Sequence, residues 1–259
     1  MPVSVSIPEY AIEFRDASYA IPAQVPRSVL QGVSLGIADG EVVAILGRSG
    51  SGKTSMLKLI NRILAFTSGD VRVGGKSVSA WNLIQLRRGI GYVIQEIGLF
   101  PHLTVRENVC IVPELERWPA DRAHLRFQEV MALVGLNAGE YENRYPRELS
   151  GGQRQRVGVA RALAADPRIL LMDEPFGALD PITRAELQRV FLDLSRRVRK
   201  TIVLVTHDLR EALLLGTRVV LLHEGHLVAS ASPDDFLQLQ HPEVREFIAA
   251  SELRAGHAA

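Results

Sequence analysis

The stretch GRSGSGKT, Gly47 to Thr54, has the spacing of a phosphate-binding loop, G-x-x-x-x-G-K-[ST]. Glycines let backbone N–H groups wrap phosphates, and a helix that follows presents the positive end of its dipole. Lys53 would then reach the β- and γ-phosphates of a nucleotide, and Thr54 would bind Mg²⁺. A chance glycine turn is the alternative, but an apolar run precedes the loop and an amphipathic one follows it. We expect nucleotide contacts from Gly47, Arg48, Ser49, Gly50, Ser51, Gly52, Lys53, Thr54 and Ser55.

Two acids, Asp173 and Glu174, follow the apolar run RILLM. One carboxylate at a strand end can hold Mg²⁺, and a second beside it can polarise an attacking water as a general base. Alone, such a pair is more often two solvated acids, but a phosphate loop in the same chain favours catalysis. His207 follows TIVLVT and could contact a γ-phosphate, although a lone histidine is more often a surface or core residue.

Tyr19 and Gln95 also have side chains that suit a nucleotide site. The ring of Tyr19 could stack on adenine, or it could simply pack. The amide of Gln95 follows a β-like run, where it could ligate Mg²⁺ or position water, or lie in a solvated turn.

A second glycine turn opens a helix in ELSGGQRQRVGVARALAAD. Ser150 is a good N-cap, and Gly151 and Gly152 leave backbone amides open, which makes an anion site at a helix N-terminus. The turn from Ser150 to Gln153 therefore either caps an amphipathic helix or binds a γ-phosphate held by another chain.

Short, continuous apolar runs must position these polar clusters. Such runs are typical of parallel strands covered on both faces, and ligands of open α/β sheets bind at the carboxyl ends of the strands. We expect strands at 42–46, 168–172, 201–206 and 218–223, and the clusters after the first three should share one site. The first 40 residues instead predict shorter, alternating strands with an Asp-Gly turn, like a small antiparallel sheet.

The region 95–150 has a helical pattern. Asp121 is expected to cap one helix and Gly135 to end it. The apolar face of that helix would be Phe127, Val130, Met131 and Val134. A later helix should carry Leu187, Phe191 and Leu194 on one stripe, and the C-terminal stretch predicts short helices fading into a tail.

Composition places the 259-residue chain among soluble globular proteins, with 47% hydrophobic and 23% charged residues. A net charge of +1 gives no reason to expect nucleic acid as a partner. The single cysteine, Cys110, excludes an internal disulfide and a multi-cysteine metal site. The sequence shows no signal peptide and no apolar run of about 18 residues, so we expect a cytosolic protein with any membrane role through a partner.

The residues LSGGQ, 149–153, resemble the signature of ATP-binding cassette (ABC) ATPases, and the other motifs stand in that family's order. The resemblance implies one α/β domain over 1–259, a P-loop NTPase of ABC type that uses ATP and Mg²⁺. It implies a mostly parallel sheet flanked by helices, with an N-terminal antiparallel β subdomain. It also implies an inserted helical subdomain at roughly 96–165 and a short tail at roughly 245–259.

By the same resemblance, two subunits form a head-to-tail homodimer, in which the Ser150 turn of one closes on the ATP of the other. Glu174 would be the catalytic base, His207 the γ-phosphate sensor, and Asp180 would lie across the dimer interface. A γ-phosphate clamped from both sides is bound only in the closed dimer.

Longer stretches, among them MDEPFGALDPITR, resemble ATPases of importers for glycine betaine, choline and related quaternary amines. This implies integral membrane permease subunits, indirectly a substrate-binding protein, and a place on the cytoplasmic face of the plasma membrane. Many such ATPases continue into regulatory CBS domains, whereas this chain ends at Ala259. An importer of another small solute, such as an amino acid, is the alternative. An ABC ATPase acting on DNA or ribosomes fits less well, because coiled-coil arms and zinc cysteines are missing, as does a phosphate-binding module without turnover.

The segment from Gln95 to Trp118 is unusually apolar. We expect an exposed patch that docks a helix of the permease, with a small local core as the alternative. Its members would be Phe100, Pro101, Leu103, Val105 and Val109.

Overall fold

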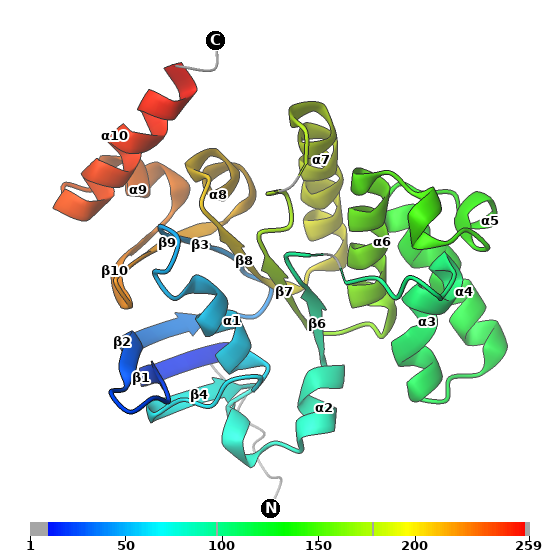
Figure 1. Ribbon diagram of the computed structural model, residues 1–259, viewed down its shortest axis with the longest axis horizontal. Helices are drawn as coiled ribbons and strands as arrows, with labels where there is room; N and C mark the ends of the chain where they lie inside the picture. The colour runs from blue at the N-terminus through cyan, green and yellow to red at the C-terminus, as the bar shows by residue number, and fades with distance from the viewer. Residues whose placement is uncertain (1–9, 97, 178, 257–259) are drawn as a thin grey trace, which may run out of the picture.

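The computed structural model describes residues 10–96, 98–177 and 179–256, so Ala178 of the turn before Asp180 and the last residues of the expected tail lie outside the described residues. A six-stranded sheet has the order β10-β9-β3-β8-β7-β6 (Figure 1). Its members are β3 (Val42–Leu46), β6 (Ile90–Val93), β7 (Ile169–Asp173), β8 (Thr201–Thr206), β9 (Arg218–His223) and β10 (His226–Ala231). The strands from β9 to β6 are parallel, and β10 is antiparallel to β9.

The central strands are buried on both faces, as their continuous apolar runs predict. Every residue of β3, β7 and β8 is buried. The predicted bounds of β3, β8 and β9 are confirmed. The prediction 168–172 is wrong by one residue, because the ladder with β8 extends to Asp173, which makes this acid part of the strand.

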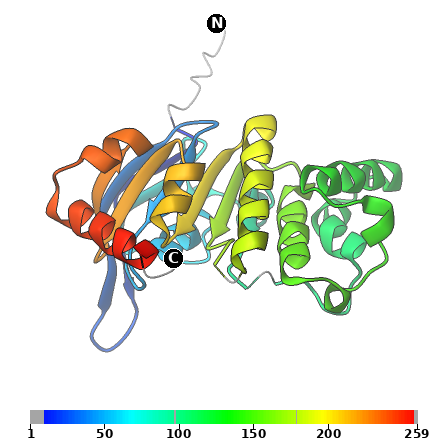
Figure 2. The same ribbon diagram turned by 90° about the horizontal axis from the view of Figure 1, so that it is seen from above.

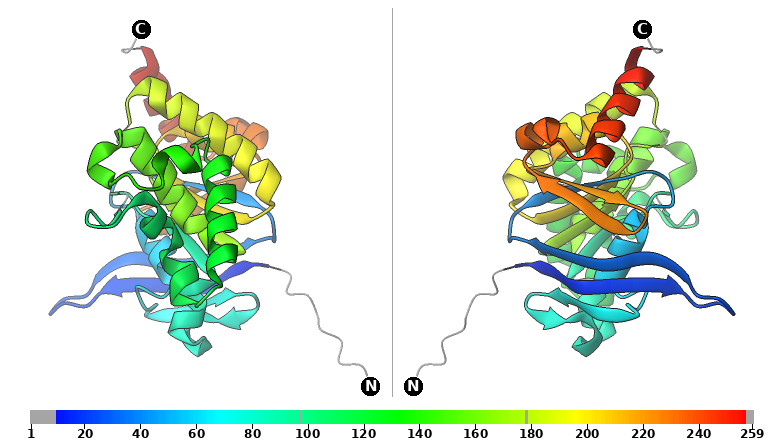
Figure 3. Two further views of the ribbon diagram at one scale, coloured as in Figure 1. Left: turned by 90° about the vertical axis from the view of Figure 1, so that its right-hand side faces the viewer. Right: turned by 90° about the vertical axis from the view of Figure 1, so that its left-hand side faces the viewer.

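A second, four-stranded sheet is antiparallel, with the order β2-β1-β4-β5. It comprises β1 (Ile12–Ile21), β2 (Arg27–Ile37), β4 (Ser68–Val73) and β5 (Lys76–Ser77). The expectation of short strands is wrong, since β1 and β2 have 10 and 11 residues and their register shifts along the pairing. Their hairpin projects from the body of the molecule (Figures 2 and 3). The Asp39–Gly40 turn leads from β2 into the other sheet, so it does not close this hairpin.

Helices group at both ends of the main sheet (Figure 1). Beside β6 and β7 lie α3 (Val105–Leu115), α4 (Ala120–Leu133), α5 (Ala138–Tyr141), the 3-10 turn Pro146–Glu148 and α6 (Gly151–Ala164). At the other end lie α9 (Pro233–Gln238) and α10 (Pro242–Gly256), and the 15 residues of α10 exceed the short helices that the sequence predicts. The remaining helical segments are α1 (Lys53–Ile60), the 3-10 turn Val78–Ala80, α2 (Leu83–Arg88), α7 (Pro181–Val198) and α8 (Leu209–Leu215).

The apolar stripes of the predicted helices face the core. Leu187, Phe191 and Leu194 of α7 are buried, as are the four apolar residues expected on one face of α4. Gly135 follows the C-cap of α4 with φ +71, as expected. The prediction that Asp121 caps α4 is wrong, because Pro119 is the N-cap and Asp121 lies in the first turn. The limits of roughly 96–165 for a helical subdomain stay a prediction.

Candidate functional site

The phosphate loop joins β3 to α1 at the carboxyl edge of the main sheet. Gly52, the N-cap of α1, has φ +103, and a Cβ there would lie 2.7 Å from Leu30 Cδ2, so this position needs glycine. The buried Lys53 donates from Nζ to the carbonyl oxygens of Gly47 (2.8 Å) and Arg48 (3.0 Å). Burial lowers the pKa of Lys53, an effect that the nearby Glu174 and Asp173 carboxylates oppose. The loop thus holds its ammonium group where an anion can bind.

Thr54 and Asp173 bring two oxygens together at the start of α1 and the end of β7. Thr54 Oγ1 donates to Asp173 Oδ1 at 2.9 Å, and Tyr92 on the neighbouring β6 donates more weakly to Oδ2 at 3.4 Å. Burial raises the pKa of Asp173, and the neighbouring Glu174 raises it further. A hydroxyl and a carboxylate are oxygen ligands that suit Mg²⁺. The residues present therefore fit the expected metal site.

Glu174 and His207 meet because β7 and β8 are adjacent parallel strands. His207 Nδ1 lies 3.2 Å from Glu174 Oε2, and the Glu174 backbone N–H donates to Val205 O at 3.0 Å. Glu174 has φ +44, a left-handed conformation that costs energy outside glycine and is common at functional sites. The side chains remain reachable, with 22% of Glu174 and 49% of His207 exposed.

A cavity of about 660 Å³ brings six of the predicted residues together. It is lined by Gly47, Arg48, Ser49, Gln95, Glu174 and His207. Its remaining wall comes from α10, through Phe247, Ala250 and Ser251. Arg48 Nη2 contacts Glu246 Oε1 of the same helix at 2.6 Å. The sequence interpretation missed this wall, whose only local signal is the buried pair Val244 and Ile248, one helical turn apart.

Other predicted residues lie away from this cavity. The Ser150 hydroxyl accepts from Gln153 N–H (3.2 Å) and Gln153 Oε1 accepts from Ser150 N–H (2.9 Å), so this turn caps α6, with Gly151 near Leu179. Asp180 caps α7, and its hydrogen bonds to Thr183 hold its pKa below the usual range.

Tyr19 lies in the core of the antiparallel sheet and is only 9% exposed, so its ring packs in this state of the chain.

A model of the ABC transporter family matches residues 30–177. The chain belongs to the ABC transporter family. It is 49% identical over 212 residues to the osmoprotectant import ATP-binding protein OsmV of Salmonella typhimurium. The matched region covers 82% of this chain and 56% of OsmV. It is 46% identical over 243 residues to the glycine betaine uptake system ATP-binding protein YehX of Escherichia coli, covering 93% and 78%. The chain thus spans little more than half the length of some curated relatives.

A solved structure of the cassette MJ0796, a dimeric post-hydrolysis state bound to ADP and Pi, shares the fold of this ABC cassette. The TM-score is 0.77 and the sequence identity is 32%. The matched region covers 86% of this chain and 98% of the MJ0796 chain. The α/β architecture, with a mostly parallel sheet flanked by helices and an N-terminal antiparallel sheet, is therefore of ABC type. Among the helices of the described residues, none has the length and apolar character needed to cross a membrane.

The apolar patch expected on the ABC cassette is only partly exposed. Phe100 is 42% exposed, but Val105 and Val109 are wholly buried, so their inclusion in the patch is wrong. The buried Asn108 ties the start of α3 to the loop before it. Its Nδ2 donates to the carbonyls of Phe100, Leu103 and Thr104 within 3.1 Å. Part of this segment therefore forms a local core, which is the alternative that the sequence left open.

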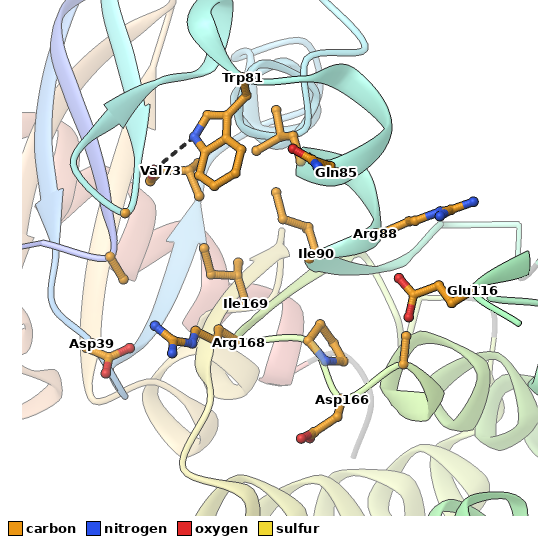
Figure 4. Close-up of a pocket in the computed structure, with 16 residues that line it drawn as sticks. Asp39, Val73, Trp81, Gln85, Arg88, Ile90, Glu116, Asp166, Arg168 and Ile169 are labelled. Carbon is orange, nitrogen blue, oxygen red and sulfur yellow. Dashed lines mark hydrogen bonds between the residues drawn. The ribbon is translucent and has the colours of Figure 1, made fainter. Parts of the chain in front are cut away.

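A second cavity, of about 680 Å³, opens where β6 and β7 begin (Figure 4). Trp81, Ile90 and Ile169 line it, and Trp81 Nε1 donates to Val73 O at 3.1 Å. It lies at the opposite edge of the sheet from the phosphate loop, since parallel strands begin at one edge and end at the other. None of the predicted site residues lines it.

Proposed function

We propose that this chain hydrolyses ATP to drive a bacterial-type importer of quaternary-amine osmoprotectants, such as glycine betaine or choline. One observation carries the proposal: the phosphate loop, Glu174 and His207 share one cavity in a chain close to half identical to OsmV. The names of the relatives support the solute class, and an importer of another small solute remains the second candidate.

The cavity supports a division of labour among its residues. Lys53 and the loop amides bind phosphate, and Thr54 with Asp173 would hold Mg²⁺, with Gln95 at the rim as a further ligand. Bound Mg²⁺ would offset the charge of the phosphates. Glu174 is positioned to accept a proton from an attacking water, and His207 to orient Glu174 and contact the γ-phosphate. Tyr19 would stack on adenine only after its ring becomes accessible.

The proposal includes a head-to-tail homodimer. The Ser150 turn and Asp180 do not line their own chain's cavity, so they are available to complete the site of a second copy. The dimeric state of MJ0796 supports the pairing of two copies. Each subunit would then offer two half-sites, and removal of the γ-phosphate would release the pair.

Separate membrane permease subunits and a substrate-binding protein would complete the importer, with this chain on the cytoplasmic side. The exposed Phe100 and its neighbours are a docking surface for the permease within this proposal. Nucleic acid is not expected as a partner, because the net charge is only +1.

The test combines uptake with hydrolysis. Cells with this chain, its permease and its binding protein are given labelled glycine betaine, choline and proline, with the Glu174→Gln variant for comparison. We expect uptake of a quaternary amine that disappears in Glu174→Gln, while the purified variant forms a stable ATP-bound dimer. Asp193→Asn, an exposed acid on α7, is the control that should keep uptake. Hydrolysis without uptake of any quaternary amine would remove the solute assignment, and full ATPase activity in Glu174→Gln would remove the base.

A further inference from the structure

Glu211 on α8 is a buried acid to which the proposed catalysis assigns no role. Its side chain is only 5% exposed. Its Oε2 accepts a hydrogen bond from Thr206 Oγ1 at 2.6 Å, and its Oε1 accepts one from Gln188 Nε2 at 3.2 Å. A buried carboxylate is costly unless hydrogen bonds and charges compensate it. Here two hydrogen bonds compensate it, and they connect it to the end of β8 and to α7.

Thr206 connects this acid to the backbone on both sides of His207. A carboxylate can only accept, so the Thr206 hydroxyl must donate to Glu211, and its lone pairs accept from Asp208 N–H at 3.0 Å. The backbone at 206 and 208 is thereby fixed, with His207 between them. His207 in turn lies 3.2 Å from Glu174. The chain of contacts runs from Glu211 to the candidate base.

A small cavity of about 20 Å³ lies between Glu211 and the Glu174–His207 pair. Arg184 of α7 borders it, and Arg184 Nε is buried without a hydrogen-bond partner among the described residues. A polar cavity of this volume has room for one water. Arg184 also donates from Nη2 to Leu179 O at 3.1 Å, in the turn that precedes Asp180. The cluster thus joins α7, α8 and the end of β8 directly behind the pair.

We propose that Glu211 is a positioning residue for hydrolysis. Through the Thr206 hydroxyl it fixes His207 against Glu174, and with Arg184 it holds one water behind them. This inference rests on the proposed function. Glu211 touches neither phosphate nor metal in this arrangement, so its loss acts on turnover and leaves nucleotide binding by the phosphate loop intact.

The test uses the two buried threonines at the ends of β8 as a matched pair. Thr201 is also buried, and its hydroxyl also makes two hydrogen bonds, to Asp39 Oδ1 (3.2 Å) and from Gly40 N–H (2.9 Å). Thr206→Val and Thr201→Val should therefore lower the melting temperature alike. Only Thr206→Val should lower kcat, by about 10- to 100-fold, with the KM for ATP unchanged.

Glu211→Ala and Glu211→Gln complete the set. The alanine variant should lose kcat like Thr206→Val, whereas glutamine still accepts from Thr206 and should stay within about threefold of the parent. Equal loss in Thr201→Val, a loss seen in KM instead of kcat, or full activity in Glu211→Ala would each overturn the inference.

A readout without turnover separates this inference from the proposed function. Hydrogen exchange of the Asp208 amide, measured on the intact chain, should speed up in Glu211→Ala and not in Thr201→Val. If the parent hydrolyses no ATP, the proposed function fails. The exchange rate of the Asp208 amide still tests whether Glu211 holds the backbone around His207. Unchanged exchange in Glu211→Ala would contradict the link whatever the activity.

Discussion

At the scale of single residues, buried charges with compensating partners surround the candidate site. Lys53, Asp173 and Glu211 are each at most 5% exposed. Burial lowers the pKa of Lys53 and raises the pKa of both acids. Each charge therefore costs stability and persists only through its hydrogen bonds. This pattern is common at functional sites, where charge is held ready for a ligand or a proton.

The pH dependence of stability follows for Glu211. Burial is the main cause of its raised pKa, with Asp208 adding to it and Thr206, Arg184 and Gln188 opposing it. The folded chain thus binds the Glu211 proton more tightly than the unfolded chain, in which the pKa of a glutamate is about 4.3. The stability contributed by protonated Glu211 is complete below that value and is lost as pH rises through the folded pKa. We expect Glu211→Gln to raise the melting temperature relative to the parent at pH 8 and not at pH 4.

Asp166 supplies a control of opposite sign. Its hydrogen bond with Lys200, 2.6 Å long, is the main cause of a lowered pKa. Its stabilising contribution is therefore present at neutral pH and lost on acidification, so Asp166→Asn should reduce the melting temperature at pH 8 only. The same pH trend in both variants would contradict the assignment for Glu211.

At the scale of elements, helix termini carry much of the proposed chemistry. Two helices, α6 and α9, share one capping bond: the hydroxyls of Ser150 and Ser232 accept from the backbone N–H three residues on, at 3.2 and 3.3 Å. Around this shared bond the caps differ: Gln153 Oε1 also accepts from Ser150 N–H, whereas the Ser232 hydroxyl also donates to Asp235 Oδ2 at 2.6 Å. In addition, only the turn at α6 has two glycines and is proposed to meet a phosphate.

Ser150→Ala and Ser232→Ala separate capping from phosphate binding. Each should cost about 1 kcal/mol of the free energy of unfolding, because each loses one N-cap. Only Ser150→Ala should also lower ATPase activity, by roughly 10-fold, if its hydroxyl binds the partner's γ-phosphate. Chemical denaturation and steady-state kinetics on the same preparations measure both quantities. Equal activities in the two variants would show that Ser150 only caps.

At the scale of the whole molecule, the proposed site is incomplete in one chain. Residues 47–49 of the phosphate loop line the cavity, while the Ser150 turn lies near Leu179 and does not line it. A site split between two copies makes complementation possible, since a defect in each half can be supplied by the other copy.

Lys53→Ala and Gly151→Asp are the variants for this experiment. A Cβ at Gly151 would make only ordinary contacts, with Leu179 Cδ2 at 3.9 Å and Arg154 Nη2 at 4.0 Å, so aspartate fits but places a negative charge where the phosphate must approach. Each variant alone should be inactive, and an equal mixture should recover up to about a quarter of parental ATPase activity through heterodimers with one intact site. Gly139→Asp, in the exposed first turn of α5, is the control and should stay active. No recovery on mixing would argue against a head-to-tail pair of independent sites.

Several features of the fold were predictable because their causes are local. The bounds of β3, β8 and β9 follow from continuous apolar runs, which only strands covered on both faces require. The cap at Ser150 and the end of α4 at Gly135 follow from side-chain and backbone chemistry within a few residues. Asp121 shows the limit of such reasoning, since this good capping residue lies two residues after the actual N-cap, Pro119.

The sequence by itself determined the motifs, their order and the strand ends that carry them, because these depend on neighbours along the chain. Only the tertiary structure decided which residues meet at long separation. Arg48 and Glu246 are 198 positions apart, and the buried pair Val244 and Ile248 does not reveal that α10 forms a wall of the cavity. The burial of Val109 and the hydrogen bond from Gln188 of α7 to Glu211 of α8 likewise depend on how elements pack. Periodicity fixes which face of an element is apolar, whereas the partner of that face is set by the three-dimensional fit of the whole chain.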